Sequence, residues 1–179
     1  MKIGTKILIL FLTLNLLSCK GSAQETEAEI LSPELGFSAM EKDTFPKAFG
    51  IINDYGEIFT ESQRTELNKT LYEYYIKTSR QIVIVTIDSI GPYQNAQKYA
   101  VALGNNWKIG TADKNNGLTI VLCSPCRQIG IATGNGTEQV LTDEICKEVI
   151  EKTIIPEFKN GNIYEGVKSG VTELIEKWE

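Results

Sequence analysis

Apolar residues recur along this chain at two spacings, one typical of helices and the other of buried strands. A first helix is predicted from apolar positions three or four residues apart, at Leu67, Leu71, Tyr74 and Tyr75. Thr60 and Gln63 stand at its start in the arrangement of a capping box. The segment 81–88 that follows is rich in β-branched residues, which favours a buried strand.

The later part of the chain repeats this change from helix to strand. Residues 96–107 have the apolar spacing of a second helix, and residues 118–123 and 127–133 are predicted to form the two strands of a hairpin. Thr142 is the expected cap of a third helix, which Pro156 ends or kinks.

The last predicted element is an amphipathic helix over residues 164–178. Helices that alternate with buried strands predict a sheet that is covered by helices on both faces. The hairpin adds an antiparallel strand, so the sheet is expected to be mixed. We therefore expect an α/β domain over residues 46–179, built as a three-layer α/β/α sandwich with a small mixed sheet.

The beginning of the chain predicts export. A basic start is followed by an apolar run, residues 7–17, which is too short to span a bilayer comfortably and has the length of a signal-peptide core. The run ends in Leu-Leu-Ser-Cys, which resembles the bacterial lipobox, in which the cysteine is lipidated and becomes the mature N-terminus. We expect residues 1–18 to be a lipoprotein signal peptide and Cys19 to carry the lipid. The alternative is an ordinary signal peptide cleaved near Ala23.

Residues 19–45 combine polar and acidic residues without apolar periodicity, which is typical of a flexible tether. The sequence thus predicts an exported domain that is lipid-anchored to a bacterial membrane, on its periplasmic or cell-surface side. Its expected partners are the membrane, through the N-terminal lipid, and a membrane protein.

Composition narrows the chemistry that this domain can use. The chain has no histidine, which excludes Ser-His and Cys-His nucleophile systems and histidine-based zinc sites. It has 18 Lys and Arg against 23 Asp and Glu, a formal charge of -5, and no basic stripe. Nucleic acid is therefore not an expected partner.

Four short motifs carry a resemblance to a known family. In chain order they are Asn53-Asp54-Tyr55, Trp107-Lys108-Ile109-Gly110, Asn115-Asn116-Gly117-Leu118 and the segment 134–143. They match an Asp before the first helix, W-x-I-G, D-N-G-[VL] and G-x-G-x-E-x-x-L-T-D. Together they resemble the TPM domain of plant thylakoid proteins, bacterial exported proteins and animal membrane proteins. The likeness extends from about Phe49 to Trp178, and the last motif is the most specific.

This resemblance implies an α/β/α fold with a divalent-cation site near the ends of the strands. Some relatives are described as acid phosphatases, and others look like accessory proteins of membrane complexes. The family therefore implies a site more clearly than it implies a reaction.

Six acidic or amide residues fall in predicted loops or at helix starts, namely Asp54, Asp113, Asn115, Asn116, Glu138 and Asp143. They offer the oxygen ligands that hard cations require, and loops at strand ends in α/β sheets commonly converge on a crevice. We therefore expect all six to form a Ca²⁺ or Mg²⁺ site. Taken singly, each is also explained as a turn former, a helix cap or a solvated charge. Asn115 stands where relatives often carry Asp, which leaves both a weak regulatory site and a tight one open.

The cysteines lie in the predicted hairpin and in the third helix. Cys123 and Cys126 form a C-x-x-C across the hairpin turn, which we interpret as a structural disulfide of an oxidising compartment. Two partly buried free thiols are the alternative. A redox pair is disfavoured because a strand follows the motif, and a zinc site lacks partners. Cys146 is expected in the core.

Two functions follow from these residues. The first is a membrane-anchored, extracytoplasmic TPM-like domain that binds a divalent cation and acts as an interaction or accessory module. The second is a metal-dependent acid phosphatase, in which Arg127 would hold phosphate with its guanidinium group. The alternative role of Arg127 is a solvated charge of the hairpin.

Overall fold

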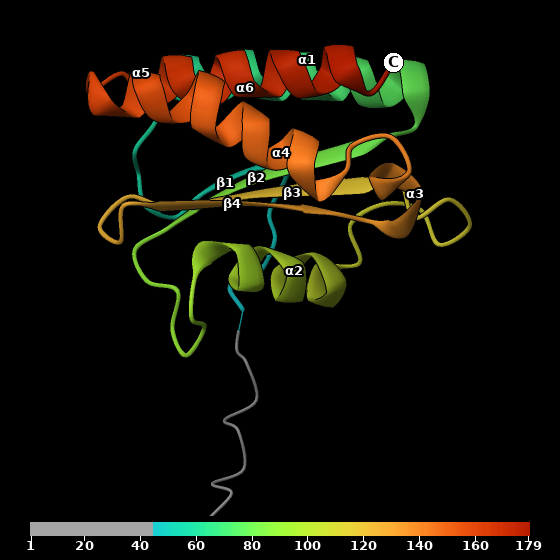
Figure 1. Cartoon of the computed structure of the whole chain (residues 1–179), viewed down its shortest axis with the longest axis horizontal. Coiled ribbons are helices and arrows are strands. Elements are labelled where there is room, and N and C mark those ends of the chain that lie inside the picture. The colour runs from blue at the N-terminus through green and yellow to red at the C-terminus, as the bar shows by residue number, and fades with distance from the viewer. Residues whose placement is uncertain (1–44) are drawn as a thin grey trace, which may run out of the picture. The chain divides into compact units, whose positions relative to one another are not determined.

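The structure of this protein is a computed structural model that describes residues 45–179 (Figure 1). The predicted signal peptide, the lipidation of Cys19 and nearly all of the predicted tether lie outside the described residues. None of the helices in the described part is long and apolar enough to cross a membrane.

Within residues 45–179, four strands form one sheet in the order β1-β2-β3-β4. The strands are β1 (Ile52–Asp54), β2 (Gln81–Ile87), β3 (Gly117–Cys123) and β4 (Gln128–Thr133). The first three are parallel, and β4 runs antiparallel to β3 as the second strand of a hairpin. The predicted mixed sheet is therefore confirmed, although the short strand β1 was not predicted from the apolar pattern.

Helices cover both faces of this sheet, as the sequence predicts. In chain order they are α1 (Glu61–Thr78), α2 (Ala96–Trp107), α3 (Asn135–Glu138), α4 (Asp143–Val149), the π-helical segment η1 (Ile150–Ile154), α5 (Ile155–Lys159) and α6 (Ile163–Lys177). Figure 1 shows α2 alone below the sheet, with α1, α4, α5 and α6 above it. This arrangement is the predicted three-layer α/β/α sandwich.

Alternation along the strands sends side chains to two separate cores. Ile84 of β2 and Ile120 of β3 face α1 and α6, whereas Val85 and Val121 face α2. All four are at most 1% exposed. A strand that is buried on both faces needs apolar residues at successive positions, which explains the continuous apolar runs of β2 and β3.

The ends of the helices follow local sequence signals. Thr60 and Gln63 form the predicted capping box of α1, and the Thr142 side chain accepts a hydrogen bond from the N–H of Ile145 at the start of α4. Pro156 does not end the third helix, which continues into α5 through the π-helical segment. A proline has no N–H to donate to the preceding turn, and the wider π turn immediately before it accommodates this loss.

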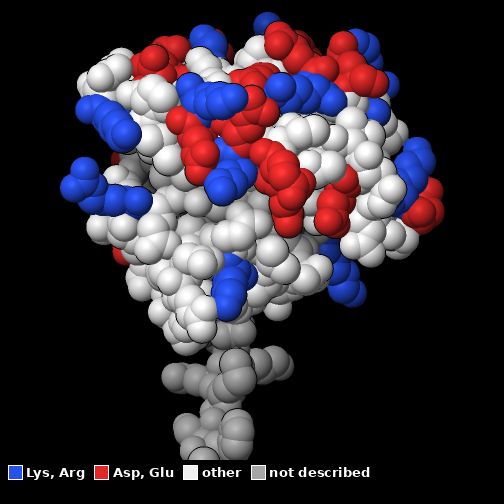
Figure 2. Space-filling view, in the orientation of Figure 1, with Lys and Arg blue, Asp and Glu red and all other residues white. Residues whose placement is uncertain are grey.

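Charges of both signs are interspersed over the outer helices. Figure 2 shows acidic and basic side chains alternating over the upper helical layer, with few charges on the α2 side of the same face. Several of these are pairs one helical turn apart, such as Lys152 with Glu148 at 2.6 Å. The visible face carries no basic stripe.

The two ends of the sheet differ in what they carry. We call the end where β2 and β3 begin and β4 ends the entry end, and the opposite end the exit end. The parallel pairing of Gln81 with Gly117, and of Ile87 with Cys123, defines these two ends.

Candidate functional site

Three of the four sequence motifs meet at the entry end, where their glycines allow loops to touch. A Cβ atom added at Gly110 would lie 2.6 Å from the nitrogen of Gly117. Cβ atoms at Gly134 and Gly136 would collide with the carbonyl oxygens of Asn115 and Lys114, respectively. Side chains at these positions would push the loops apart, so the motifs need glycine for close backbone approach.

Hydrogen bonds hold the same loops together. The Thr137 hydroxyl donates to the carbonyl oxygen of Gly117 at 2.9 Å, and Thr137 is completely buried. The N–H of Gly136 donates to the carbonyl oxygen of Asn115 at 3.1 Å. The segment 134–138 is therefore fixed on the loop that leads into β3.

Asn116 acts as a structural clamp within this cluster. Its Oδ1 atom accepts hydrogen bonds from the N–H and the hydroxyl of Thr111 at 3.0 and 3.1 Å. Its Nδ2 atom donates to the carbonyl oxygen of Ser79 at 2.8 Å, and the residue is 8% exposed. Its amide oxygen is thus already engaged by protein donors, which makes Asn116 a poor cation ligand.

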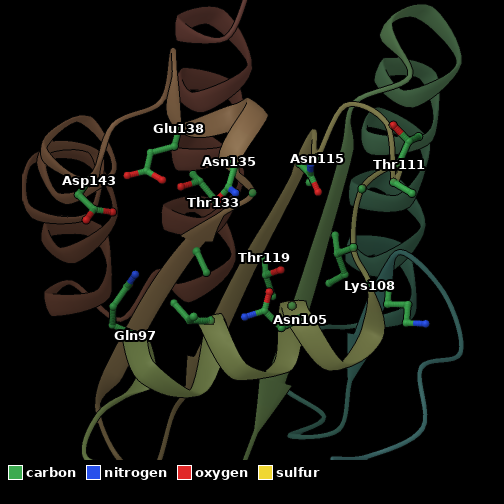
Figure 3. A pocket seen from close by; sticks show the side chains of 18 residues that line it. Gln97, Asn105, Lys108, Thr111, Asn115, Thr119, Thr133, Asn135, Glu138 and Asp143 are labelled. Carbon is green, nitrogen blue, oxygen red and sulfur yellow. The ribbon is translucent and has the colours of Figure 1, made fainter.

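A pocket of about 800 Å³ opens beside this loop cluster (Figure 3). One wall is the outward face of α2, with Gln97, Val101 and Asn105. The opposite wall carries Glu138 of α3 and Asp143 of α4. The pocket therefore follows the outer edge of the sheet at β4, with α2 on one side and the start of α4 on the other.

Three of the six predicted ligand residues line this pocket, namely Asn115, Glu138 and Asp143. Figure 3 shows the side chains of Glu138 and Asp143 on the same side of the pocket. Neither carboxylate forms an ion pair with any residue of the described part. Lys108 is the only basic residue in the lining, and Figure 3 shows it extending away from both carboxylates.

Asp113 lies nearby but does not line the pocket. Its side chain is exposed to solvent on the loop between α2 and β3. Hydrogen bonding from the Thr111 side chain lowers the pKa of its carboxyl group. Asp113 therefore fits the alternative role of a turn residue.

Asp54 lies at the other end of the sheet, so the expectation that all six residues converge needs correction. Its carboxylate accepts hydrogen bonds from the N–H groups of Ile58 and Phe59, both at 3.1 Å. It also accepts from the Thr86 hydroxyl at 2.6 Å and from Arg64 at 3.1 Å. Asp54 is the last residue of the parallel strand β1, whereas the other five residues lie before β3 or after β4, at the entry end.

The separation between Asp54 and the pocket follows from the register. Asp54 pairs with Thr86, which in turn pairs with Leu122 of β3. Gly117, which lines the pocket, is five residues earlier on that strand, or about 16 Å away. One cation therefore does not reach both Asp54 and the pocket carboxylates.

Arg127 and the C-x-x-C motif also lie at the exit end. A disulfide joins Cys123 and Cys126 across the β3–β4 turn, and Arg127 has a left-handed backbone with a φ of 55°. The structure does not bring Arg127 to the pocket, so it does not supply a phosphate-holding group there. Cys146 is a buried free thiol, as predicted.

Sequence reasoning missed the polar residues that line the rest of the pocket. Gln97, Asn105, Thr119 and Asn135 all belong to this lining. The available signal was Thr119, a hydroxyl residue inside an otherwise apolar strand. The amides of α2 are indistinguishable from ordinary surface residues until the position of the helix is known.

The lining offers two carboxylates and several neutral oxygens. Among residues 45–179, no three acidic or cysteine side chains are grouped so as to hold a metal ion by themselves. A hard cation bound by Glu138 and Asp143 would therefore keep open positions for other oxygen ligands, since Ca²⁺ takes six to eight.

Comparisons with known proteins agree with this architecture. The sequence model of the TPM domain matches residues 52–177. The N-terminal domain of a protein from P. gingivalis is 28% identical with a TM-score of 0.65, covering 71% of this chain and 80% of that one. No curated protein matches the sequence.

Two further solved structures share the fold at lower identity. BA42 from the psychrophilic bacterium Bizionia argentinensis is 18% identical with a TM-score of 0.59, over 69% of this chain and 83% of that one. The N-terminal domain of cg2496 from Corynebacterium glutamicum is 12% identical with a TM-score of 0.56, over 76% and 85%.

Proposed function

This chain belongs to the TPM domain family, and on that premise we propose that its pocket binds a divalent cation, Ca²⁺ or Mg²⁺, through Glu138 and Asp143. The observation that carries this proposal is the pairing of two carboxylates without a basic partner in one pocket. Two carboxylates on one side of the same pocket favour a counter-ion there. Asn115 and neutral oxygens of the rim are the additional candidate ligands.

The residues that line the pocket fit a site that binds a hard cation with modest affinity. Carboxylate, amide and hydroxyl oxygens are the donors that Ca²⁺ and Mg²⁺ prefer, and affinity rises with the number of charged ligands. With two carboxylates the affinity is expected to be modest, so the occupancy of the site would follow changes in cation concentration. When bound, the cation neutralises this acidic wall.

Calorimetric titration of the purified protein with CaCl₂ and with MgCl₂ tests the proposal. Glu138→Gln and Asp143→Asn should each weaken binding by about tenfold or more, because carboxylates dominate hard-cation affinity. Asp88→Asn is the matched control, since it removes one exposed charge just after β2, at the exit end. Equal affinities in all four proteins would refute the site.

We further propose that the domain acts as an accessory or interaction module held at a bacterial membrane by lipid on Cys19. The lipobox-like sequence supports this anchor. Replacing Cys19 with Ala should move the protein from the membrane fraction to the aqueous fraction. Unchanged partitioning of the variant would contradict the lipid anchor without affecting the cation proposal.

A further inference from the structure

The outer edge of β4 forms part of the pocket wall. The Gln97 carboxamide imitates a neighbouring strand there: its Nε2 donates to the carbonyl oxygen of Ile131 at 2.7 Å. The N–H of Ile131 donates back to Gln97 Oε1 at 2.9 Å. These bonds show that the backbone groups of Ile131 point away from β3.

The backbone groups of Thr133 point the same way. In an antiparallel ladder, successive residues of a strand direct their N–H and C=O groups to opposite sides, so Thr133 repeats the orientation of Ile131. The N–H of Gly134, one residue later, donates to the carbonyl oxygen of Gly117 in β3, in agreement with this alternation. Thr133 lines the pocket, so its donor and acceptor are presented to a ligand.

A buried hydroxyl on the pocket floor also lacks a protein partner. Thr119 of β3 is 2% exposed and lines the pocket, and its side chain forms no hydrogen bond with any residue in 45–179. Gly104 of α2 packs closely over this hydroxyl, since a Cβ there would lie 2.8 Å from Thr119 Oγ1. A ligand atom in the pocket would give this hydroxyl a hydrogen-bond partner.

We propose that this pocket binds an extended, acidic peptide segment of a partner protein, added along the β4 edge at Thr133. A carboxylate of the peptide completes the coordination of the cation at Glu138 and Asp143, while Thr119 bonds the segment on the pocket floor. Strand addition obtains affinity from backbone groups and specificity from alternate side chains. This proposal rests on the cation site of the proposed function.

Charge favours an acidic peptide over a phosphate compound. The cation offsets the two carboxylates and leaves coordination positions that need oxygen donors. Phosphate recognition relies on Arg or on clustered basic groups, and the pocket lining contains only Lys108. The N–H and C=O of Thr133 pair directly with a peptide backbone, which offers both a donor and an acceptor, whereas an ionised phosphate offers acceptors.

Affinity selection tests the proposal with a library of capped hexapeptides that carry Asp or Glu at one fixed position and mixed residues elsewhere. The purified protein should retain acidic peptides in CaCl₂ and release them in EDTA. The selected peptide should lose binding when its acidic residue becomes Asn or Gln, or when its backbone nitrogens are methylated. Retention that is independent of Ca²⁺ or of the acidic residue would overturn the proposal.

Two variants separate this proposal from the cation site. Thr119→Val, which keeps the side-chain shape, should weaken the selected peptide by about tenfold, the value of one hydrogen bond, and leave Ca²⁺ affinity unchanged. Thr172→Val on the exposed side of α6 is the matched control and should change neither. If Ca²⁺ binds normally but no peptide is retained, the peptide proposal is refuted and the cation site stands. Binding of phenyl phosphate in place of a peptide would have the same meaning.

Discussion

Gly104 of α2 lies directly over the hydroxyl of Thr119 in β3. A Cβ atom at Gly104 would be 2.8 Å from Thr119 Oγ1 but 3.7 Å, an ordinary contact, from Thr119 Cβ. The close approach of α2 to β3 therefore needs glycine at position 104. A methyl group there would collide with the hydroxyl of Thr119 but not with its Cβ atom. This relationship is testable because each partner can be changed separately.

Gly104→Ala should change the free energy of unfolding differently in two backgrounds. Alanine in a helix interior is favoured over glycine by about 1 kcal/mol. Beside Thr119 the new methyl group collides with the hydroxyl, so the free energy of unfolding should not rise. In a Thr119→Ala background the collision is gone, and Gly104→Ala should stabilise the protein by about 1 kcal/mol. Urea unfolding measures this cycle, and equal effects in both backgrounds would exclude the contact.

Gly136→Ala should destabilise the loop cluster at the entry end. The new Cβ would collide with the carbonyl oxygen of Lys114, which is backbone and cannot swing aside. The loss in the free energy of unfolding should be about 2 kcal/mol, the usual cost of overpacking. Gly50→Ala is the control, because its Cβ would meet nothing closer than 3.9 Å. Similar unfolding curves for both variants would contradict the interlocked loops.

Asp54→Asn should lower stability without changing cation binding. The native Oδ2 accepts from the N–H of Phe59 and from Arg64. An amide nitrogen at this position would be a donor facing two donors. Removing one acceptor oxygen from this hydrogen-bonded pair, in which the Arg64 side chain is 39% exposed, should cost about 2 kcal/mol. Urea unfolding and Ca²⁺ titration of the same sample check the two parts. A weaker Ca²⁺ affinity with unchanged stability would return Asp54 to the cation site.

Cys146 should be unreactive in the folded protein. Burial, with a smaller contribution from the negative charge of Asp143, raises the pKa of its thiol from 9.0 to about 12. The raised pKa keeps the thiol protonated at pH 8, and only the thiolate attacks disulfide reagents. In a Cys19→Ser variant, such a reagent should modify Cys146 only after urea unfolds the protein. Fast modification of the folded variant would show that the helix opens locally.

Asn115→Asp should tighten cation binding. Asn115 lines the pocket with a left-handed backbone, a φ of 47°, which aspartate tolerates nearly as well. A third carboxylate in the lining should strengthen Ca²⁺ binding by about tenfold. Asn160→Asp, on an exposed turn after α5, is the control for the change in net charge. Equal affinities would place Asn115 outside the coordination sphere.

The sequence by itself determined the layers of this protein. Capping at Thr60, the continuous apolar strands β2 and β3, and the hairpin that follows are local signals, since period and cap chemistry depend on neighbours along the chain. Three of the four sequence motifs also lie together at the entry end. Their contact is a tertiary feature, since the loops come from distant parts of the chain.

Only the tertiary structure decided which of the candidate ligands share a site. Asp54 and Asp143 have the same chemistry and each stands at an end of its strand or helix, but strand order and register place them at opposite ends of the sheet. Gln97 was equally invisible, because only the position of α2 over the β4 edge brings its side chain to the backbone of Ile131. Periodicity tells which face a residue occupies. Packing between distant segments decides which end it reaches and what it meets there.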